Sequence, residues 1–247
     1  MAAQRHLSKA PAREALIDIQ FESSVSLDTI DRFTAAAERS FKRRTNLSEA
    51  FFGIRSDGSS TRTGHSIIGR RLDSENPPHV LQCRETGFTF SRLSPYGEWG
   101  ELRAEAKRWW DLFYSEIGPR TVTRIAVRYV NAITLPLPVG DFSEYLVCPP
   151  RLPAALPQAV SGFLQRVIVP DEISNCTSVI TQVLEDKPAV GNDGSSITVL
   201  LDIDVFRMTH FVDSNIADVW TGLDELRMQK NRMFFEHLTE KAMEIFE

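Results

Sequence analysis

The order in which two kinds of apolar pattern follow each other constrains the fold of this chain more than any other feature. Stretches in which apolar and polar residues alternate are typical of strands, and here they come in consecutive blocks. These blocks lie at 15–22, within 49–96, at 121–138, and at about 160–169, 175–185 and 196–209. Apolar residues at helical spacing recur at about 27–43, 97–117 and 214–246.

This order of elements favours an α+β fold, because the strands follow one another instead of alternating with helices. We expect a mainly antiparallel, curved sheet with three main helices packed on it. Ser26 is expected to cap the first helix, and the basic run Lys42–Arg44 to close it. Gly118 and Pro119 end the second helix, and the third is predicted to be one long C-terminal helix.

The strand predicted at 121–138 is the most regular in the chain. Because side chains alternate between the faces of a strand, its residues divide into two sets. One face is expected to carry Thr123, Ile125, Val127, Tyr129, Asn131 and Ile133. The other is expected to carry Arg124, Ala126, Arg128, Val130 and Ala132.

The length of 247 residues suits a single domain with a sizeable core, without disulfide or metal support. A proline-rich crossover at 136–157 is the best candidate for an internal boundary. We therefore predict one α+β domain, 1–247, whose halves, 1–135 and 158–247, are joined by this crossover.

Cysteine usage and hydropathy predict a cytoplasmic protein. Cys83, Cys148 and Cys176 are odd in number and far apart, which is typical of reduced thiols, and zinc-ligand spacing is absent. No apolar run approaches the ~20 residues of a membrane span, and the start of the chain lacks the apolar core of a secretory signal. We expect no membrane association and no cofactor.

Four segments of the sequence carry a resemblance to a known family. They are Pro11–Phe21, Phe88–Tyr96 with Trp99, Arg124–Ile133, and the terminal segment with Asn231, Phe234, Phe235 and Thr239. The chain resembles a sporadically distributed, uncharacterised bacterial and archaeal family of similar length. The Arg-x-x-x-Arg-Tyr-x-Asn strand is the most specific part of the match. The resemblance implies one full-length unit, and it implies no particular activity, because none is established for the family.

Two arginines and two aspartates are the candidate site residues. Arg124 and Arg128 share one strand face, and Asp202 and Asp204 share one face of a later strand. Two interpretations stay open: the guanidiniums hold a phosphate or carboxylate ligand, or they pair with the aspartates across the sheet. Tyr129 and the neighbouring Asn131 face the other way and are expected to form hydrogen bonds within the core.

Other chemistry has weaker support. Asp202, Asp204, His210 and Asp213 have no second compact set of ligands, so no metal site is predicted. No nucleophile elbow or Cys-His signature occurs, and Gly191–Gly194 is predicted to be a turn between strands. The net charge of −5 and the lack of a recognised motif argue against nucleic acid as a partner.

Two hypotheses for function follow from these observations. The first is a cytoplasmic binding module for a protein partner, such as an antitoxin-like or defence-accessory protein, by analogy alone. The alternative is a small-ligand-binding protein or enzyme with an Arg/Asp-lined pocket on the sheet. The alternative predicts that Arg128→Ala abolishes ligand binding at a nearly unchanged melting temperature. The sequence leaves open whether the protein is an enzyme.

Overall fold

The computed structural model describes residues 2, 5, 7–54, 61–185 and 196–247, with the side chains of 51–54 and 61–63 excepted. The strands are β1 (Ala12–Phe21), β2 (Arg43–Ile54), β3 (Thr61–Asp73), β4 (His79–Arg84), β5 (Gly87–Leu93), β6 (Val122–Pro136), β7 (Leu164–Asp171), β8 (Cys176–Leu184) and β9 (Ser196–Phe211). The α-helices are α1 (Leu27–Ala37), α2 (Trp99–Ile117), α3 (Asp218–His237) and α4 (Glu240–Met243). Short 3-10 turns are η1 (Phe142–Glu144), η2 (Asp213–Asn215) and η3 (Glu244–Phe246).

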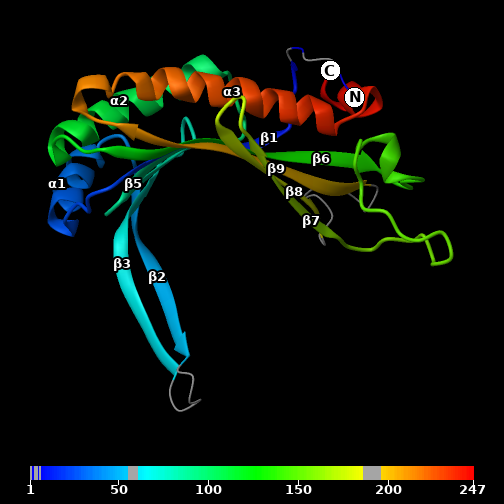
Figure 1. Ribbon diagram of the computed structural model, residues 1–247, viewed down its shortest axis with the longest axis horizontal. Coiled ribbons are helices and arrows are strands. Elements are labelled where there is room, and N and C mark those ends of the chain that lie inside the picture. Colours follow the sequence, from blue (N-terminus) through cyan, green and yellow to red (C-terminus); the bar gives the residue numbers. More distant parts are fainter. Residues whose placement is uncertain (1, 3–4, 6, 55–60, 186–195) are drawn as a thin grey trace.

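The strands form one antiparallel sheet in the order β2-β3-β4-β5-β1-β6-β9-β8-β7. The sheet curves into an arch, with α1, α2 and α3 on its convex side (Figure 1). The hairpin of β2 and β3 extends away from the body of the sheet at one end. The predicted α+β class, the mainly antiparallel curved sheet and the three main helices are confirmed.

The topology of the first half of the chain recurs in the second. Strand β1 is followed by α1, then by β2, β3, β4 and β5, and then by α2. Strand β6 is followed by the crossover, then by β7, β8 and β9, and then by α3. β1 and β6 pair at the centre of the sheet, where the two halves meet. By topology the halves divide between α2 and β6, whereas the sequence placed the division in the proline-rich crossover. The second half has no described counterpart of α1 or β2.

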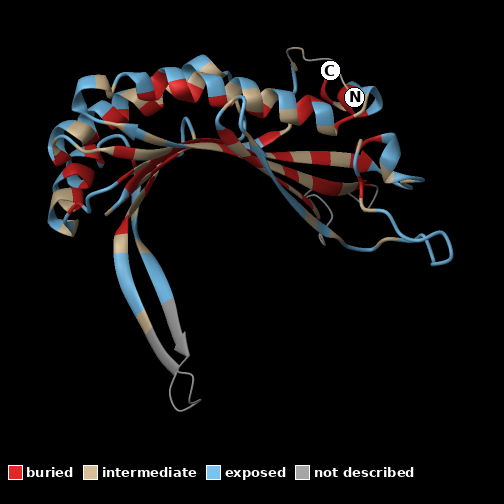
Figure 2. Ribbon diagram, in the orientation of Figure 1, coloured by how far each residue is buried: buried red, intermediate tan, exposed pale blue. Residues whose placement is uncertain are grey.

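The core lies between the convex face of the sheet and the helices, where Figure 2 shows the buried residues. In the first half, Phe113 of α2 packs against Phe21, Phe33 and Phe88 at ring-centroid distances of 6.4, 5.0 and 5.9 Å. In the second half, α3 packs on β6 and β9. The concave face of the sheet carries no described helix.

The first and last helices end earlier than the sequence predicted. α1 ends at Ala37, and the basic residues Arg43 and Arg44 instead begin β2, where Arg44 forms an ion pair with Asp31 of α1. The sequence suggested that these basic residues stabilise the dipole at the end of the helix. Instead, the backbone of Arg43 and Arg44 pairs with β3.

The C-terminal helix is interrupted at Leu238, whose φ of −116° and ψ of 149° are extended. Leu238 forms a β-bridge with Leu146 of the crossover, and Thr239 then caps α4. A contact with a distant segment therefore ends a helix that local spacing would continue. The turn predicted at Gly191–Gly194 lies outside the described residues.

Candidate functional site

The candidate arginines and aspartates lie on the concave face of the sheet, where they form ion pairs. Arg128 donates to Asp202 through Nε and Nη2, at 2.8 and 2.7 Å. Arg124 donates to Asp204 at 3.3 Å and, at 2.9 Å, to Asp18 of β1. The structure thus brings all four predicted residues together and pairs them across β6 and β9.

Asp18 is a member of this group that sequence reasoning missed. It accepts hydrogen bonds from Thr89 at 2.6 Å and Gln20 at 3.2 Å, and it pairs with Arg84 of β4 as well as with Arg124. The sequence did contain a sign of this role, because Asp18 is a carboxylate in the middle of a predicted strand and lies between two apolar residues, Ile17 and Ile19. Within the group, three guanidiniums face three carboxylates.

This balance favours a structural role for the group. The guanidiniums are already satisfied by carboxylates, so they have no unpaired charge to offer an anionic ligand. Burial raises the pKa of Asp204, while the positive charges of Arg124 and Arg128 oppose that shift. None of the three cavities described below is lined by these residues.

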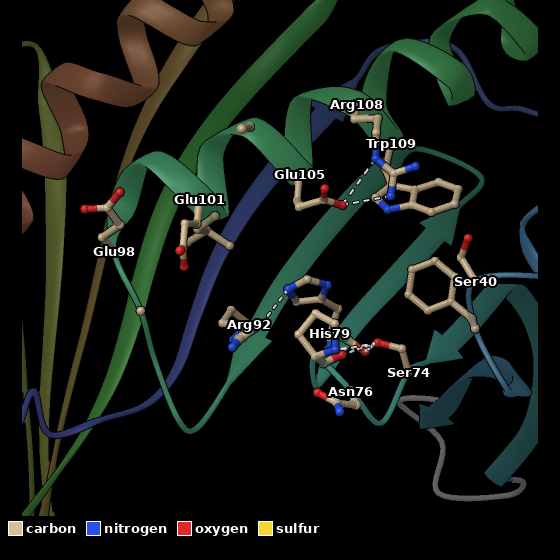
Figure 3. Close-up of a pocket in the computed structure, with 15 residues that line it drawn as sticks. Ser40, Ser74, Asn76, His79, Arg92, Glu98, Glu101, Glu105, Arg108 and Trp109 are labelled. Atoms are coloured by element: carbon tan, nitrogen blue, oxygen red, sulfur yellow. Dashed lines mark hydrogen bonds and ion pairs between the residues drawn. The ribbon is translucent and has the colours of Figure 1, made fainter.

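The first cavity, of about 580 Å³, lies between α2 and the ends of β4 and β5 (Figure 3). Arg92 and Nε2 of His79 lie 3.1 Å apart, and burial followed by the charge of Arg92 lowers the pKa of this imidazole. Glu105 pairs with Arg108 at 2.8 Å on the helix above. Burial and the charge of Arg92 therefore both favour the neutral form of His79, and Glu105 and Arg108 are already paired with each other.

A second cavity, of about 620 Å³, lies beside α3 where the chain termini approach the sheet. The hydroxyl groups of Tyr96 and Tyr129 lie 2.6 Å apart at its wall, and Nδ2 of Asn131 donates to the carbonyl of Leu201 at 2.9 Å. Nζ of Lys230 lies 3.4 Å above the centroid of the Tyr129 ring. The expected core hydrogen bonds of Tyr129 and Asn131 are therefore present, and both residues also face a cavity.

Segments that carried the family resemblance converge at this second cavity. Its lining includes Pro11, Ala12, Tyr96, Trp99, Tyr129, Asn131, Asn231, Phe234 and Phe235. Lys230, which the sequence analysis did not single out, lies among them. A lysine on an otherwise amphipathic helix gives no sign in the sequence that it is buried. A third, larger cavity of about 1130 Å³ follows the crossover from Leu137 to Ser161.

The edge strand β7 exposes more large apolar side chains than any other element described. Leu164 is 71% exposed, Ile168 59%, Val167 44% and Val169 36%. Val167 lies opposite the buried Ile180 on the face that carries the helices, and Ile168 lies on the concave face. The strand is therefore apolar and accessible on both of its faces.

The backbone of β7 is also open along its outer edge. The amide of Leu184 in β8 donates to the carbonyl of Phe163, the residue before β7, at 3.1 Å. Because antiparallel pairing uses every second residue, the N–H and C=O groups of Leu164, Arg166 and Ile168 point away from β8. Pro170 shares this orientation and has no N–H, which is usual for proline at a sheet edge.

Metal and membrane features can be assessed only for the described part of the chain. There, no group of three or more His, Cys, Asp or Glu side chains is arranged to hold a metal ion. The thiols of Cys83, Cys148 and Cys176 are free, and burial raises the pKa of Cys83. None of the described helices combines the length and the apolar composition needed to cross a bilayer.

Comparison with known proteins adds no functional assignment. No protein-family model matches the sequence, and a search of curated proteins found no match. The resemblance to the sporadically distributed family therefore stays a prediction, and function must be argued from the geometry.

Proposed function

We propose that this protein is a cytoplasmic binding module that receives an extended segment of a partner protein along the free edge of β7. The observation that carries this proposal is the exposure of Leu164, Val167, Ile168 and Val169 beside an open row of backbone donors and acceptors. Exposed edges of this kind pair readily with another strand, and proteins normally cover, shorten or charge them. Strand addition uses both features, since backbone bonds give affinity and side-chain contacts give specificity.

The asymmetry between the two halves supports an added strand at this position. In the first half, β3 is covered on its outer edge by β2. β7 occupies the position in the second half that β3 occupies in the first, and no described strand pairs with its outer edge. A partner segment antiparallel to β7 would complete the correspondence.

The charges on the concave face favour a protein partner over a nucleic acid. Phosphate recognition depends on basic residues that are free to replace counterions. Here Arg84, Arg124 and Arg128 are each paired with a carboxylate. The same pairing gives no support to an Arg/Asp-lined ligand pocket on the sheet.

The test is affinity capture from a lysate of the native cell, with the tagged full-length protein and two variants. Ile168→Pro removes an outward N–H, while the pairing of β7 with β8 uses other residues. Leu112→Lys is the matched control, because Leu112 is an exposed apolar residue on α2, away from the edge. We expect Ile168→Pro to lose the protein that the wild type captures and Leu112→Lys to retain it, with melting temperatures close to the wild type.

Two further measurements identify the occupant. Hydrogen exchange of the purified complex should protect the amides of Leu164, Arg166 and Ile168 more strongly than in the free protein. Equal capture by Ile168→Pro and wild type, or no such protection, would contradict strand addition. Light scattering that shows a wild-type dimer and an Ile168→Pro monomer would assign the edge to a second copy and overturn the proposal of a partner protein.

A further inference from the structure

The cavity beside α3 contains a lysine whose surroundings do not neutralise its charge. Lys230 is 7% exposed, and its contact with the Tyr129 ring is the only interaction of its amine found among the described residues. No described carboxylate contributes to its electrostatics. A buried ammonium without a hydrogen-bonded counter-charge is costly, so the fold retains an unfavourable group at the wall of a cavity.

A second cation lies one helical turn away. Arg227 also lines the cavity, and within the described residues it forms no ion pair or hydrogen bond. Residues three apart on a helix share a face, so Arg227 and Lys230 present two positive groups to the same space. Arg5, at the rim, is by contrast already paired with Glu240 and Glu247.

The remaining walls are aromatic rings, amide groups and small apolar residues, with one carboxylate, Glu98, which does not contribute to the electrostatics of Lys230. Trp99, Tyr96 and Phe234 offer planar apolar surface, and Asn231 offers an amide. A cavity of about 620 Å³ is within the usual range for small-molecule sites, and a few polar groups among apolar walls are typical of them. The combination of two cations with aromatic rings in one cavity fits an anion with an apolar body better than it fits inorganic phosphate.

We propose that this cavity binds a small aromatic carboxylate, with its carboxylate between Lys230 and Arg227 and its ring against Tyr96, Trp99 and Phe234. The site is separate from the edge of β7, and it stands whether or not β7 binds a partner. Burial, and then the nearby charge of Arg227, lower the pKa of Lys230 to about 7. Carboxylate binding should therefore be strongest below pH 7 and weaken by up to about tenfold for each pH unit above it.

The test uses the full-length protein and three probes, with binding measured by calorimetry and by quenching of tryptophan fluorescence. The probes are 2-naphthoate, its neutral analogue naphthalene-2-carboxamide, and inorganic phosphate. We expect 2-naphthoate to bind and the other two to bind at least about tenfold more weakly, because each lacks one of the two features. The affinity for 2-naphthoate should fall between pH 7 and 9.

Two variants locate the binding. Lys230→Met should weaken binding of 2-naphthoate by about 10–100-fold, the usual effect of losing a charge-assisted hydrogen bond. Lys107→Met is the control, because Lys107 of α2 is exposed and paired with Asp111, and it should bind as the wild type does. We expect Lys230→Met to raise the melting temperature, because this apolar replacement removes a buried charge, so a melting temperature at or above that of the wild type separates loss of binding from unfolding.

Three outcomes would overturn the proposal. The first is the absence of 2-naphthoate binding, and the second is equal binding by wild type and Lys230→Met. The third is binding of inorganic phosphate as tight as that of 2-naphthoate, which would show a general anion site without selection for an aromatic body.

Discussion

At the scale of single residues, the concave face depends on Asp18 more than on the arginines that the sequence emphasised. Asp18 joins β1 to both β4 and β6, through Arg84 and Arg124. Its side chain is 10% exposed, whereas that of Arg128 is 44% exposed. Exposure decides how much each ion pair contributes, because solvent screens a pair at the surface and leaves a buried charge uncompensated when its partner is lost.

We predict that Asp18→Ala lowers the free energy of unfolding by about 3–5 kcal/mol, because it leaves the largely buried Arg124 short of a partner. Arg128→Ala should lower it by less than about 1 kcal/mol, since that pair is largely solvated. Urea denaturation of the two variants measures both values. An equal loss in the two variants would be inconsistent with the assigned difference in burial.

This difference also changes the test suggested by the sequence. An unchanged melting temperature in Arg128→Ala was expected to distinguish a ligand-binding arginine from a structural one. Because Arg128 is exposed, its replacement should leave stability nearly unchanged under both interpretations. Asp18 and Arg124 discriminate between them, since only a structural network makes these two residues essential for folding.

Lys230 gives a prediction on pH dependence. Its pKa is about 7 in the folded protein and near 10.5 in the unfolded chain, so between these values the unfolded state binds more protons. The free energy of unfolding therefore rises with pH over this window, and the effect of Lys230 on it is constant below pH 7. We predict that Lys230→Met raises the melting temperature at pH 7 and that its advantage over wild type shrinks towards pH 10. A constant difference across this range would contradict the depressed pKa.

At the scale of elements, the contact between α3 and β6 depends on a glycine. A Cβ atom on Gly222 would lie 2.7 Å from Cδ1 of Ile125, closer than real contacts allow. Alanine favours a helix by about 1 kcal/mol over glycine, but overpacking typically costs about 1–3 kcal/mol. The absence of a side chain at Gly222 therefore lets the helix approach the sheet.

We predict that Gly222→Ala destabilises the protein in the wild-type background, by about 1 kcal/mol net. In an Ile125→Val background, which removes the methyl group in the way, the same substitution should be neutral or stabilising. A double-mutant cycle from thermal denaturation measures this coupling. Additive effects of the two substitutions would show that the close approach does not limit the packing.

At the scale of the whole molecule, the pairing of β1 with β6 links the two topological halves. One sheet runs through both of them, and the buried apolar residues form one continuous cluster. Trp110 of α2 lies in the first half and Trp220 of α3 lies in the second, and both are buried. The two halves can therefore be followed separately by fluorescence.

We predict a single cooperative unfolding transition, because separating the halves would expose the central strands of the sheet. Variants that retain only Trp110 or only Trp220, with the other tryptophans replaced by phenylalanine, should show the same urea midpoint. Far-ultraviolet circular dichroism of each variant gives the urea midpoint of the whole molecule, with which the fluorescence midpoint of the same variant is compared. Two separate midpoints within one variant would mean that the halves unfold independently.

The sequence by itself determined the fold class, the approximate positions of the strands, and the two faces of β6. One of its two interpretations was that arginines of β6 pair with Asp202 and Asp204, because alternate residues along each strand share a face. These features follow from local periodicity, which each segment carries in its own residues. The structure contains the pairs Arg128–Asp202 and Arg124–Asp204.

The tertiary structure alone decided which strands are neighbours, where the last helix breaks, and which groups are buried without partners. Asp18 meets Arg84, Leu238 meets Leu146, and Lys230 is enclosed beside Tyr129 only because segments far apart in the chain come together. The exposed edge of β7 is also set by its place at the end of the sheet, because no described strand pairs with its outer side. Periodicity specifies which side of an element is apolar, but contacts between distant segments decide what, if anything, covers it.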